Sequence, residues 1–127
     1  MLETSPHHHQ ALTSLAECYV KLERPERAET PLNEAIRLQP NYTLAWYQRG
    51  MMYLHIGRNE NALDDFQAAV RCDGKHLESR LKIAAIHHQA ERFEDAETAW
   101  LAVLAQAPDH TIARTRLADC EAHMAKL

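Results

Sequence analysis

The sequence repeats itself every 34 residues, and this self-similarity constrains the fold more than any other feature. Pro6 and Pro40 lie one interval apart, Pro108 lies two intervals further on, and Gly74 fills the remaining slot. Three more series keep the same spacing: Ala28, Ala62 and Ala96; Leu32, Phe66 and Trp100; Ala35, Ala69 and Val103. A chain of 127 residues with this pattern is expected to form one domain built from copies of a single small unit.

Within each unit the apolar residues follow a helical period. Leu12, Leu15, Ala16 and Tyr19 have the i, i+3, i+4, i+7 spacing of one helix face, and a second such stripe follows in every unit. Strand signals are absent, because β-branched residues are scattered without alternation. The sequence therefore predicts about seven helices, over residues 8–22, 25–38, 42–56, 59–72, 76–90, 93–106 and 110–125.

These positions resemble the tetratricopeptide repeat, whose pattern is W-x2-L-G-x2-Y, then A-x3-F, then P. The residues that carry the resemblance are Trp46, Gly50, Tyr53, Ala62, Phe66 and Ala69. It implies an all-α fold in which antiparallel helix-turn-helix repeats stack in a right-handed superhelical solenoid. The expected repeats are 9–42, 43–76 and 77–110, with a polar terminal helix at 111–127 that serves as a cap. We expect a single domain over 1–127, which is either a piece of a longer array, as we favour, or a repeat stack with an abbreviated start.

Two residues depart from the pattern. Arg49 stands where Leu is usual, on the face turned toward the second helix. Either it reaches a ligand, or, as we favour, its stem packs while its head finds a carboxylate. Pro31 falls deep in the second helix of the first repeat, where it removes a hydrogen bond and strains the carbonyl of Arg27. A kink or a loosened turn is expected there.

In a stack of this family, the first helices line one concave surface. The positions opposite the core stripe define the candidate groove: Thr13, Glu17, Leu44, Tyr47, Met51, Leu54, His55, Glu78, Leu81, Ala85, His88, Thr115 and Asp119. Its centre is apolar, which suits a peptide or amphipathic segment of a partner protein. The alternative is that neighbouring helices cover much of this surface. The predicted function is a non-catalytic scaffold for protein–protein interaction.

One function known for members of this family, the binding of chaperone C-terminal tails, can be checked against the residues of this sequence. Chaperone adaptors of this family hold a partner's C-terminal carboxylate with a clamp of Lys, Asn and Arg side chains. In one register the clamp positions hold Thr13, Glu17, Gln48, Glu78 and Lys82, and in the other Tyr47, Met51, Lys82, Ile112 and Arg116. Neither register assembles the clamp, and carboxylates at Glu17 and Glu78 would repel another carboxylate. We therefore expect no chaperone-tail binding.

Other function classes find little support. The formal charge of −4 gives no basic footprint for nucleic acid. No run of apolar residues approaches the ~18 needed to span a membrane, and no signal peptide opens the chain. Metalloprotease, nucleophile-elbow and phosphate-loop motifs are absent, so no enzyme and no cofactor are expected. The competing possibility is self-association into a homo-oligomer, through the stacking of exposed repeat ends.

Nine histidines and three cysteines remain. The run His7–His9 aligns with repeat sequence, and His87 replaces a core aromatic, so a packed, hydrogen-bonded ring is expected there. Five others map to the groove or its edge: His55, His76, His88, His110 and His123. They predict pH-sensitive binding rather than a metal site. The odd count of widely spaced cysteines favours reduced thiols and a cytoplasmic setting.

Overall fold

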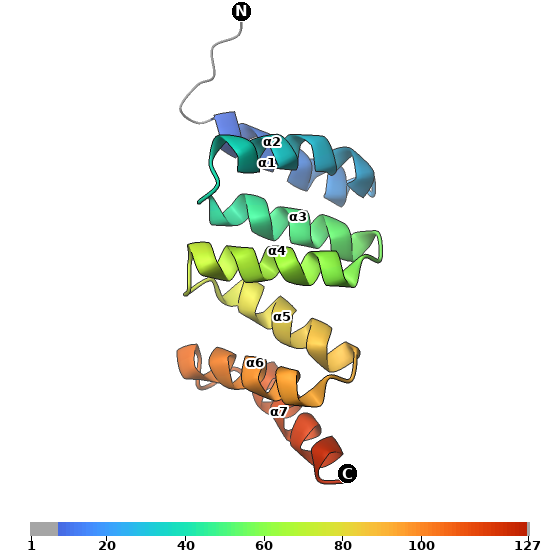
Figure 1. Cartoon of the computed structure of the whole chain (residues 1–127), viewed down its shortest axis with the longest axis vertical. Helices are drawn as coiled ribbons and strands as arrows, with labels where there is room; N and C mark the ends of the chain where they lie inside the picture. Colours follow the sequence, from blue (N-terminus) through green and yellow to red (C-terminus); the bar gives the residue numbers. More distant parts are fainter. Residues whose placement is uncertain (1–7, 127) are drawn as a thin grey trace, which may run out of the picture. The chain divides into compact units, whose positions relative to one another are not determined.

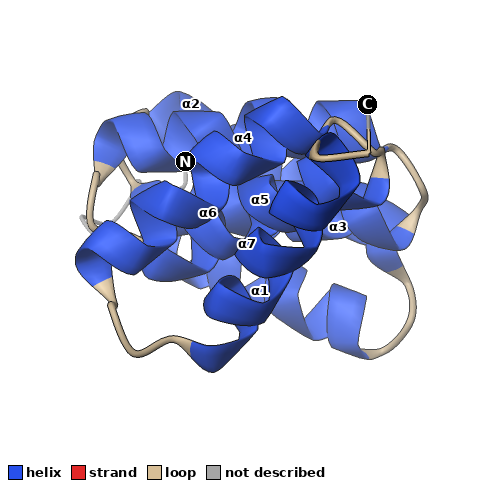
Figure 2. Ribbon diagram, turned by 90° about the horizontal axis from the view of Figure 1, so that it is seen from below, coloured by secondary structure: helices blue, strands red, loops and turns tan. Residues whose placement is uncertain are grey.

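The computed structural model describes residues 8–126, which form helices joined by short turns (Figures 1 and 2). The seven α-helices are α1 (His8–Lys21), α2 (Glu29–Leu38), α3 (Thr43–His55), α4 (Asn59–Cys72), α5 (Leu77–Gln89), α6 (Phe93–Gln106) and α7 (Thr111–Met124). A 3-10 helix, η1 (Pro25–Ala28), precedes α2. No strand occurs between residues 8 and 126. The predicted helices are all present with ends within one residue of those expected, except that the helix expected over 25–38 begins as η1 and becomes α-helical only at Glu29.

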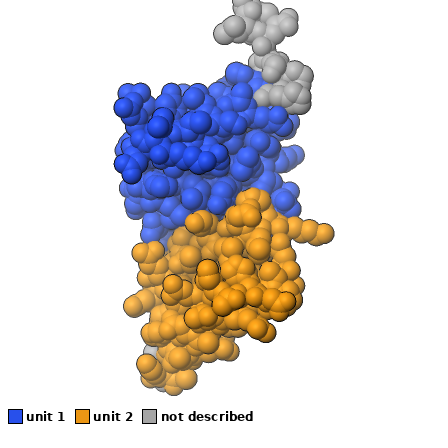
Figure 3. Space-filling model, turned by 180° about the vertical axis from the view of Figure 1, so that it is seen from behind, with its two compact units in different colours: residues 1–74 blue, residues 75–127 orange. Residues whose placement is uncertain are grey.

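The chain divides into two compact units, 1–74 and 75–127 (Figure 3). In unit 1, α1 packs against η1 and α2, α2 against α3, and α3 against α4. In unit 2, α6 packs against both α5 and α7. Residues 1–7 and 127 lie outside the described part, and with them Pro6 and His7. None of the described helices is long and apolar enough to cross a bilayer.

Small residues let the helices of each pair approach closely, as the repeat pattern predicts. Ala28, Ala62 and Ala96 are fully buried at the start of the second helices. On the first helix α3, a Cβ added to Gly50 would stand 2.7 Å from Cε1 of Phe66. Such a separation is shorter than van der Waals contact, so the buried Phe66 ring leaves room only for glycine.

The turn between the two helices is the same in all three repeats. Glu23, Gly57 and Glu91 each have a positive φ, of 60°, 83° and 60°. In each turn the next amide bonds a carbonyl five residues back, as in Arg58 to Tyr53 at 2.8 Å. This is the Schellman arrangement, which ends a helix with a left-handed residue. Two of the three turns therefore hold a glutamate in a conformation that favours glycine.

Pro31 loosens the start of its helix, as expected, but without a kink in its middle. The segment begins as the 3-10 helix η1, in which the amides of Arg27 and Glu29 bond carbonyls only three residues back. Regular α-helix starts at Glu29, so Pro31 lies in its first turn, where its missing N–H leaves no gap in the ladder. The first repeat thus accommodates Pro31 by delaying the α-helix.

Arg49 is a structural residue, which confirms the favoured interpretation. Its guanidinium donates two hydrogen bonds of 2.8 Å to the carboxylate of Asp65 on α4 and one of 3.1 Å to Asn33 on α2. It also lies 5.1 Å from the centre of the Trp46 ring, within cation–π range. Arg49 therefore ties three helices of unit 1 together.

Three histidines have local structural roles. The Nδ1 atom of His76 accepts from the amide of Ser79, and that of His110 accepts from the amide of Ala113. Both are therefore N-caps, of α5 and α7. His87 is half-buried and accepts from Nε of Arg92 at 3.0 Å, so the expected packed, hydrogen-bonded ring is confirmed.

Two residues of α1 differ from expectation. Thr13, assigned to the groove, is 1% exposed, and its hydroxyl donates to the carbonyl of His9. Leu15, assigned to the core stripe, is 45% exposed. Leu15 is the counterpart of Arg49, which contacts Asn33 on the preceding second helix. In the described part of the chain α1 contacts η1, α2 and α3, and none of these covers Leu15.

Candidate functional site

The first helices of unit 1 enclose a hollow of about 260 Å³, which we call the unit-1 hollow. It is lined by Glu17, Val20 and Lys21 of α1 and by Tyr47, Gln48, Met51 and His55 of α3. Four of the predicted groove residues, Glu17, Tyr47, Met51 and His55, thus come together. Of the other predicted residues of this unit, Leu44 is exposed, Leu54 is half-buried and Thr13 is buried.

The charges of the unit-1 hollow are already engaged. Glu17 accepts a 3.0 Å hydrogen bond from Nε2 of Gln48, a buried residue that sequence reasoning left out of the groove. Nζ of Lys21 lies 3.5 Å from the same carboxylate. The polar rim is therefore balanced, and Met51 and Tyr47 supply the apolar surface that a ligand would contact.

Unit 2 has a hollow of about 390 Å³, the unit-2 hollow. It is lined by Ala85, His88 and Gln89 of α5, Trp100 of α6, and Ile112 and Arg116 of α7. Ala85 and His88 were predicted for the groove. Ile112 is 61% exposed and Arg116 is exposed, so both are presented at the surface. Both residues occupy positions of the chaperone-tail clamp in the sequence, and this was the sequence feature that could have pointed to them.

The remaining predicted residues of unit 2 lie outside its hollow. Leu81 packs against the core cluster that contains Trp100 and Val103. Glu78 is exposed and lies 3.2 Å from Nε2 of His76, and Thr115 is exposed. Asp119 bonds His88 instead of lining the hollow, at 2.8 Å. The structure thus brings together some of the predicted residues in each unit and gives the others packing or pairing roles.

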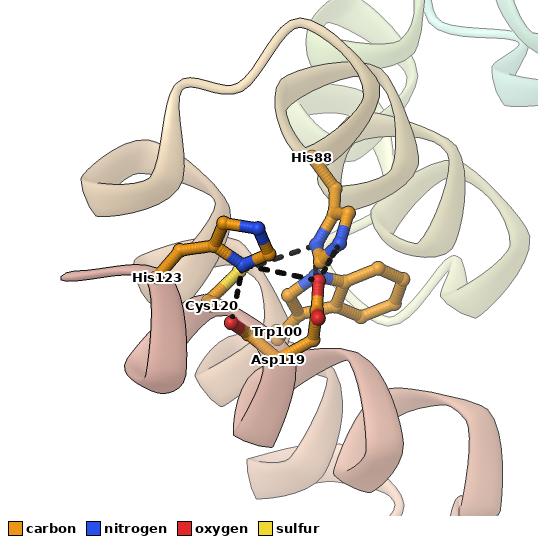
Figure 4. Close-up of polar contacts among 5 residues, drawn as sticks. All are labelled: His88, Trp100, Asp119, Cys120 and His123. Atoms are coloured by element: carbon orange, nitrogen blue, oxygen red, sulfur yellow. Dashed lines mark hydrogen bonds and ion pairs between the residues drawn. The ribbon is translucent and has the colours of Figure 1, made fainter. Parts of the chain in front are cut away.

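Around His88 lies a polar cluster that sequence reasoning missed (Figure 4). Its Nδ1 accepts from Nε1 of Trp100 at 3.2 Å and lies 3.2 Å from Sγ of Cys120. Its Nε2 lies 2.8 Å from Oδ2 of Asp119, and His123 bonds the Asp119 carbonyl at 2.9 Å. We call His88, Trp100, Asp119, Cys120 and His123 the His88 cluster. It joins the three helices of unit 2.

A thiol, an imidazole and a carboxylate in this order resemble a nucleophile with its base and orienting acid. The chemistry does not follow, because Cys120 is 0% exposed and no substrate atom can reach its sulfur. Burial raises the pKa of the Cys120 thiol, and the nearby carboxylates of Asp119, Glu97 and Glu121 raise it further. Trp100 also occupies the nitrogen that would serve as base. The cluster therefore acts as a structural core.

No group of three or more His, Cys, Asp or Glu side chains within residues 8–126 is placed to hold a metal ion. The three cysteines are unpaired thiols, with Cys18 exposed, Cys72 half-buried and Cys120 buried. Both units therefore offer open hollows of mixed polar and apolar lining, formed mainly by first helices.

A family model for the tetratricopeptide repeat matches residues 2–43, 15–76 and 81–124, which together span most of the sequence. The chain belongs to the tetratricopeptide repeat family. Its fold class is the all-α helical-repeat solenoid of that family. The family is generally a non-enzymatic interaction module, and nothing in this repeat chain points to catalysis.

Among curated proteins, this repeat chain is 26% identical over 120 residues to DnaJ homolog subfamily C member 3 of Gallus gallus. It is 27% identical over 108 residues to Superkiller complex protein 3 of Homo sapiens. These matches cover 85% of the chain in both cases, but only 24% and 7% of the relatives. The chain therefore spans a quarter or less of the length of each.

Several solved structures, among them tetratricopeptide repeat domains, share the fold at low identity. The second such domain of human RPAP3, in complex with an HSP70 peptide, has a TM-score of 0.82 at 22% identity, covering 92% of this chain and 98% of that one. The first such domain of Spaghetti (RPAP3), bound to an HSP90 peptide, has a TM-score of 0.83 at 16% identity, covering 98% and 99%. A MamA crystal structure has a TM-score of 0.86 at 17% identity, covering 95% and 71%.

Proposed function

We propose that this chain is a protein-interaction scaffold that binds an apolar or amphipathic peptide segment of a partner along the inner faces of its first helices. The observation that carries the proposal is the pair of hollows, each formed mainly by first helices and each lined by apolar and polar side chains in about equal number. Met51 and Tyr47 supply adaptable and aromatic contact surface in unit 1, and Ile112 and Ala85 supply it in unit 2.

The test begins with selection of peptides from a random displayed library, followed by affinity measurement on the selected sequences. Met51→Glu and Ala85→Glu place a charge in each hollow without disturbing the core, and each is expected to weaken binding at least about tenfold, or 1.4 kcal/mol. Leu81 is unsuitable for this purpose because it packs against the core of unit 2. Leu101→Glu, on an exposed residue of α6 outside both hollows, is the matched control. Equal affinity for all three variants would refute the groove.

We further propose that this chain does not capture chaperone C-terminal tails. The RPAP3 domains are bound to HSP70 and HSP90 peptides, so the fold itself is compatible with such ligands. Here Glu17 lies in the unit-1 hollow, and of the clamp positions only Lys82 and Arg116 carry cations. Titration with the peptides SGPTIEEVD and SRMEEVD should show no saturable binding. Saturable binding that Arg116→Ala abolishes would overturn this expectation.

Self-association is a second candidate, and the exposure of Leu15 favours it. The equivalent residue of the next repeat, Arg49, contacts a preceding second helix, and Leu15 leaves an apolar side chain exposed at the same position of the repeat. A second copy of this chain would bury it. Light scattering over a range of concentrations should then show association that Leu15→Glu removes. A constant monomer mass would exclude this function while leaving peptide binding intact.

A further inference from the structure

The position of protons on His88 follows from its neighbours. The indole Nε1–H of Trp100 can only donate a hydrogen bond, so Nδ1 of His88, at 3.2 Å, must be the acceptor. A nitrogen that accepts carries no proton. The remaining proton of the neutral ring must therefore be on Nε2, which lies 2.8 Å from Oδ2 of Asp119 and donates to it.

The Cys120 thiol can donate a second hydrogen bond to Nδ1 of His88. The pKa of its thiol is raised by burial, so near neutral pH the sulfur carries its hydrogen and is a donor. Sγ lies 3.2 Å from Nδ1 of His88. Two donors from two different helices thus converge on one unprotonated nitrogen (Figure 4). The folded unit selects a single tautomer of neutral His88.

We propose that the protonation of His88 controls the unit-2 hollow, so that acidification weakens the binding of an apolar peptide segment there. This regulation rests on the function proposed above. The second proton can enter only at Nδ1, where it would face the donor hydrogen of Trp100, whereas the Cys120 thiol can rotate and accept from the new N–H. The imidazolium and the Trp100 hydrogen bond therefore exclude each other.

The consequence for binding follows from which residues line the hollow. His88 and Trp100 both line the unit-2 hollow. Loss of the hydrogen bond between these two side chains therefore lets part of the lining move. Protonation also places a positive charge in the same lining as the Arg116 guanidinium. A cation beside an apolar ligand must be desolvated when the ligand binds, which costs free energy. Both effects act against an apolar side chain.

The charged surroundings of His88 come mainly from α7. The Asp119 carboxylate lies 2.8 Å from its Nε2, and the Arg116 guanidinium lines the same hollow. Nδ1 of His123 lies 3.6 Å from the same Asp119 carboxylate and is a second titratable group. Glu97 of α6 and Glu121 of α7 act on Cys120, whereas the α6 residues that face the ring directly, Phe93 and Trp100, are uncharged. His123→Gln separates the two histidines.

The first experiment uses the free chain and needs no partner. Nitrogen NMR between about pH 5.5 and 8 should find His88 in the Nε2–H tautomer, with the Trp100 indole N–H signal moving at the His88 midpoint. Trp46 is an internal control, because its indole donates to the carbonyl of Pro40 at 2.8 Å and should stay constant. His88→Asn should abolish the Trp100 shift and His123→Gln should keep it. An Nδ1–H tautomer, or a Trp100 signal that stays flat while His88 titrates, would overturn the proposal.

The second experiment measures the affinity of the selected peptide at the two ends of the same pH range. The wild-type chain should bind several-fold more weakly at the acidic end, and His88→Asn should bind equally at both. If that variant unfolds, His88→Gln replaces it. Affinity that is independent of pH in the wild type would refute regulation even with both NMR results in place. Failure to select any peptide would instead count against the proposed function, since the NMR outcome does not depend on a ligand.

Discussion

Each unit of the chain carries a polar group inside its helix packing, and the two groups differ in kind. In unit 1 Arg49 is permanently charged and binds Asp65 through two hydrogen bonds of 2.8 Å. In unit 2 Nδ1 of His88 accepts from Trp100, and its Nε2 lies 2.8 Å from Oδ2 of Asp119. An arginine stays charged over the physiological pH range, whereas histidine is the residue type whose charge ordinarily can change there.

The same repeat scaffold therefore accepts a polar residue at two different kinds of position, as Arg49 and His88 show. Arg49 occupies a position that faces the second helices, and its partner Asp65 is only 3% exposed. Burial raises the pKa of Asp65, the hydrogen bonds from Arg49 oppose that rise, and the same bonds raise the pKa of Arg49. His88 lies instead on the face that lines a hollow. The first pair stabilises the core, and the second can couple the core to a surface.

The largest effect is expected for Asp65→Ala in unit 1. Removing the carboxylate leaves the Arg49 guanidinium partly buried without its main partner, which costs about 3–5 kcal/mol of unfolding free energy. Urea denaturation followed by circular dichroism measures the loss. Asp64→Ala, on the exposed neighbour, should change stability by less than about 0.5 kcal/mol.

A double variant shows whether the charge or the packing matters in that pair. Arg49→Leu with Asp65→Leu removes both charges and fills the space with apolar groups, so it should be more stable than Asp65→Ala alone. If the double variant were the less stable of the two, the network that includes Asn33 and Trp46 would outweigh the burial cost of the ion pair.

A smaller loss is expected for His88→Ala in unit 2. The change removes the hydrogen bonds of the His88 side chain and its ring contacts with Phe93 and Trp100. Together these contribute about 2 kcal/mol to the free energy of unfolding. Because the cluster joins α7 to the other helices, the amides of α7 should show the largest gain in hydrogen exchange. His55→Ala, on an exposed histidine of unit 1, is the control and should leave stability unchanged.

The sequence predicted the repeat architecture well because each core position occurs once in every repeat, so its residue type can be read several times. Ala62 and Phe66 recur in kind at every interval, so their burial could be inferred before any contact was known. The bond between His88 and Asp119 could not be inferred in this way. It joins residues 31 positions apart on different helices, and the register places both on the same face without saying that they meet.

Pro31 and Thr13 show a second limit of the sequence. The sequence locates the strain at Pro31, but whether a helix kinks or starts later depends on how well a 3-10 turn can satisfy the preceding amides. Thr13 follows the groove periodicity, yet it is buried and bonds the carbonyl of His9. The helical period assigns a face, while the exposure on that face depends on neighbouring helices.

Close helix approach can be compared between the repeats through Gly50. Gly50→Ala places a methyl group against the buried Phe66 ring, 2.7 Å from its nearest carbon, and the overpacking costs about 1–3 kcal/mol. The gain in helix propensity returns about 1 kcal/mol, so the net loss should be about 1 kcal/mol. Adding Phe66→Leu reproduces the Ala16 and Leu32 pair of the first repeat. The changes in unfolding free energy caused by the two substitutions, measured by urea denaturation, should then be non-additive. Simple additivity would show that the two side chains do not compete for space.

The smallest effects are expected at the turns, where Gly57 of unit 1 and Glu91 of unit 2 occupy the same position of the repeat. Gly57 of unit 1 has a φ of 83°, and a Cβ added there would meet nothing within 4 Å. The cost of Gly57→Ala, about 1 kcal/mol, would therefore come from the backbone alone. Glu91 of unit 2 has a φ of 60°, so Glu91→Gly relieves the same strain. The greater freedom of glycine in the unfolded chain offsets part of that relief, which leaves a gain of about 0.5 kcal/mol. Opposite signs for these two variants in thermal unfolding would show that one backbone requirement governs both turns. A loss of stability from Glu91→Gly would instead mean that the Glu91 side chain itself stabilises unit 2.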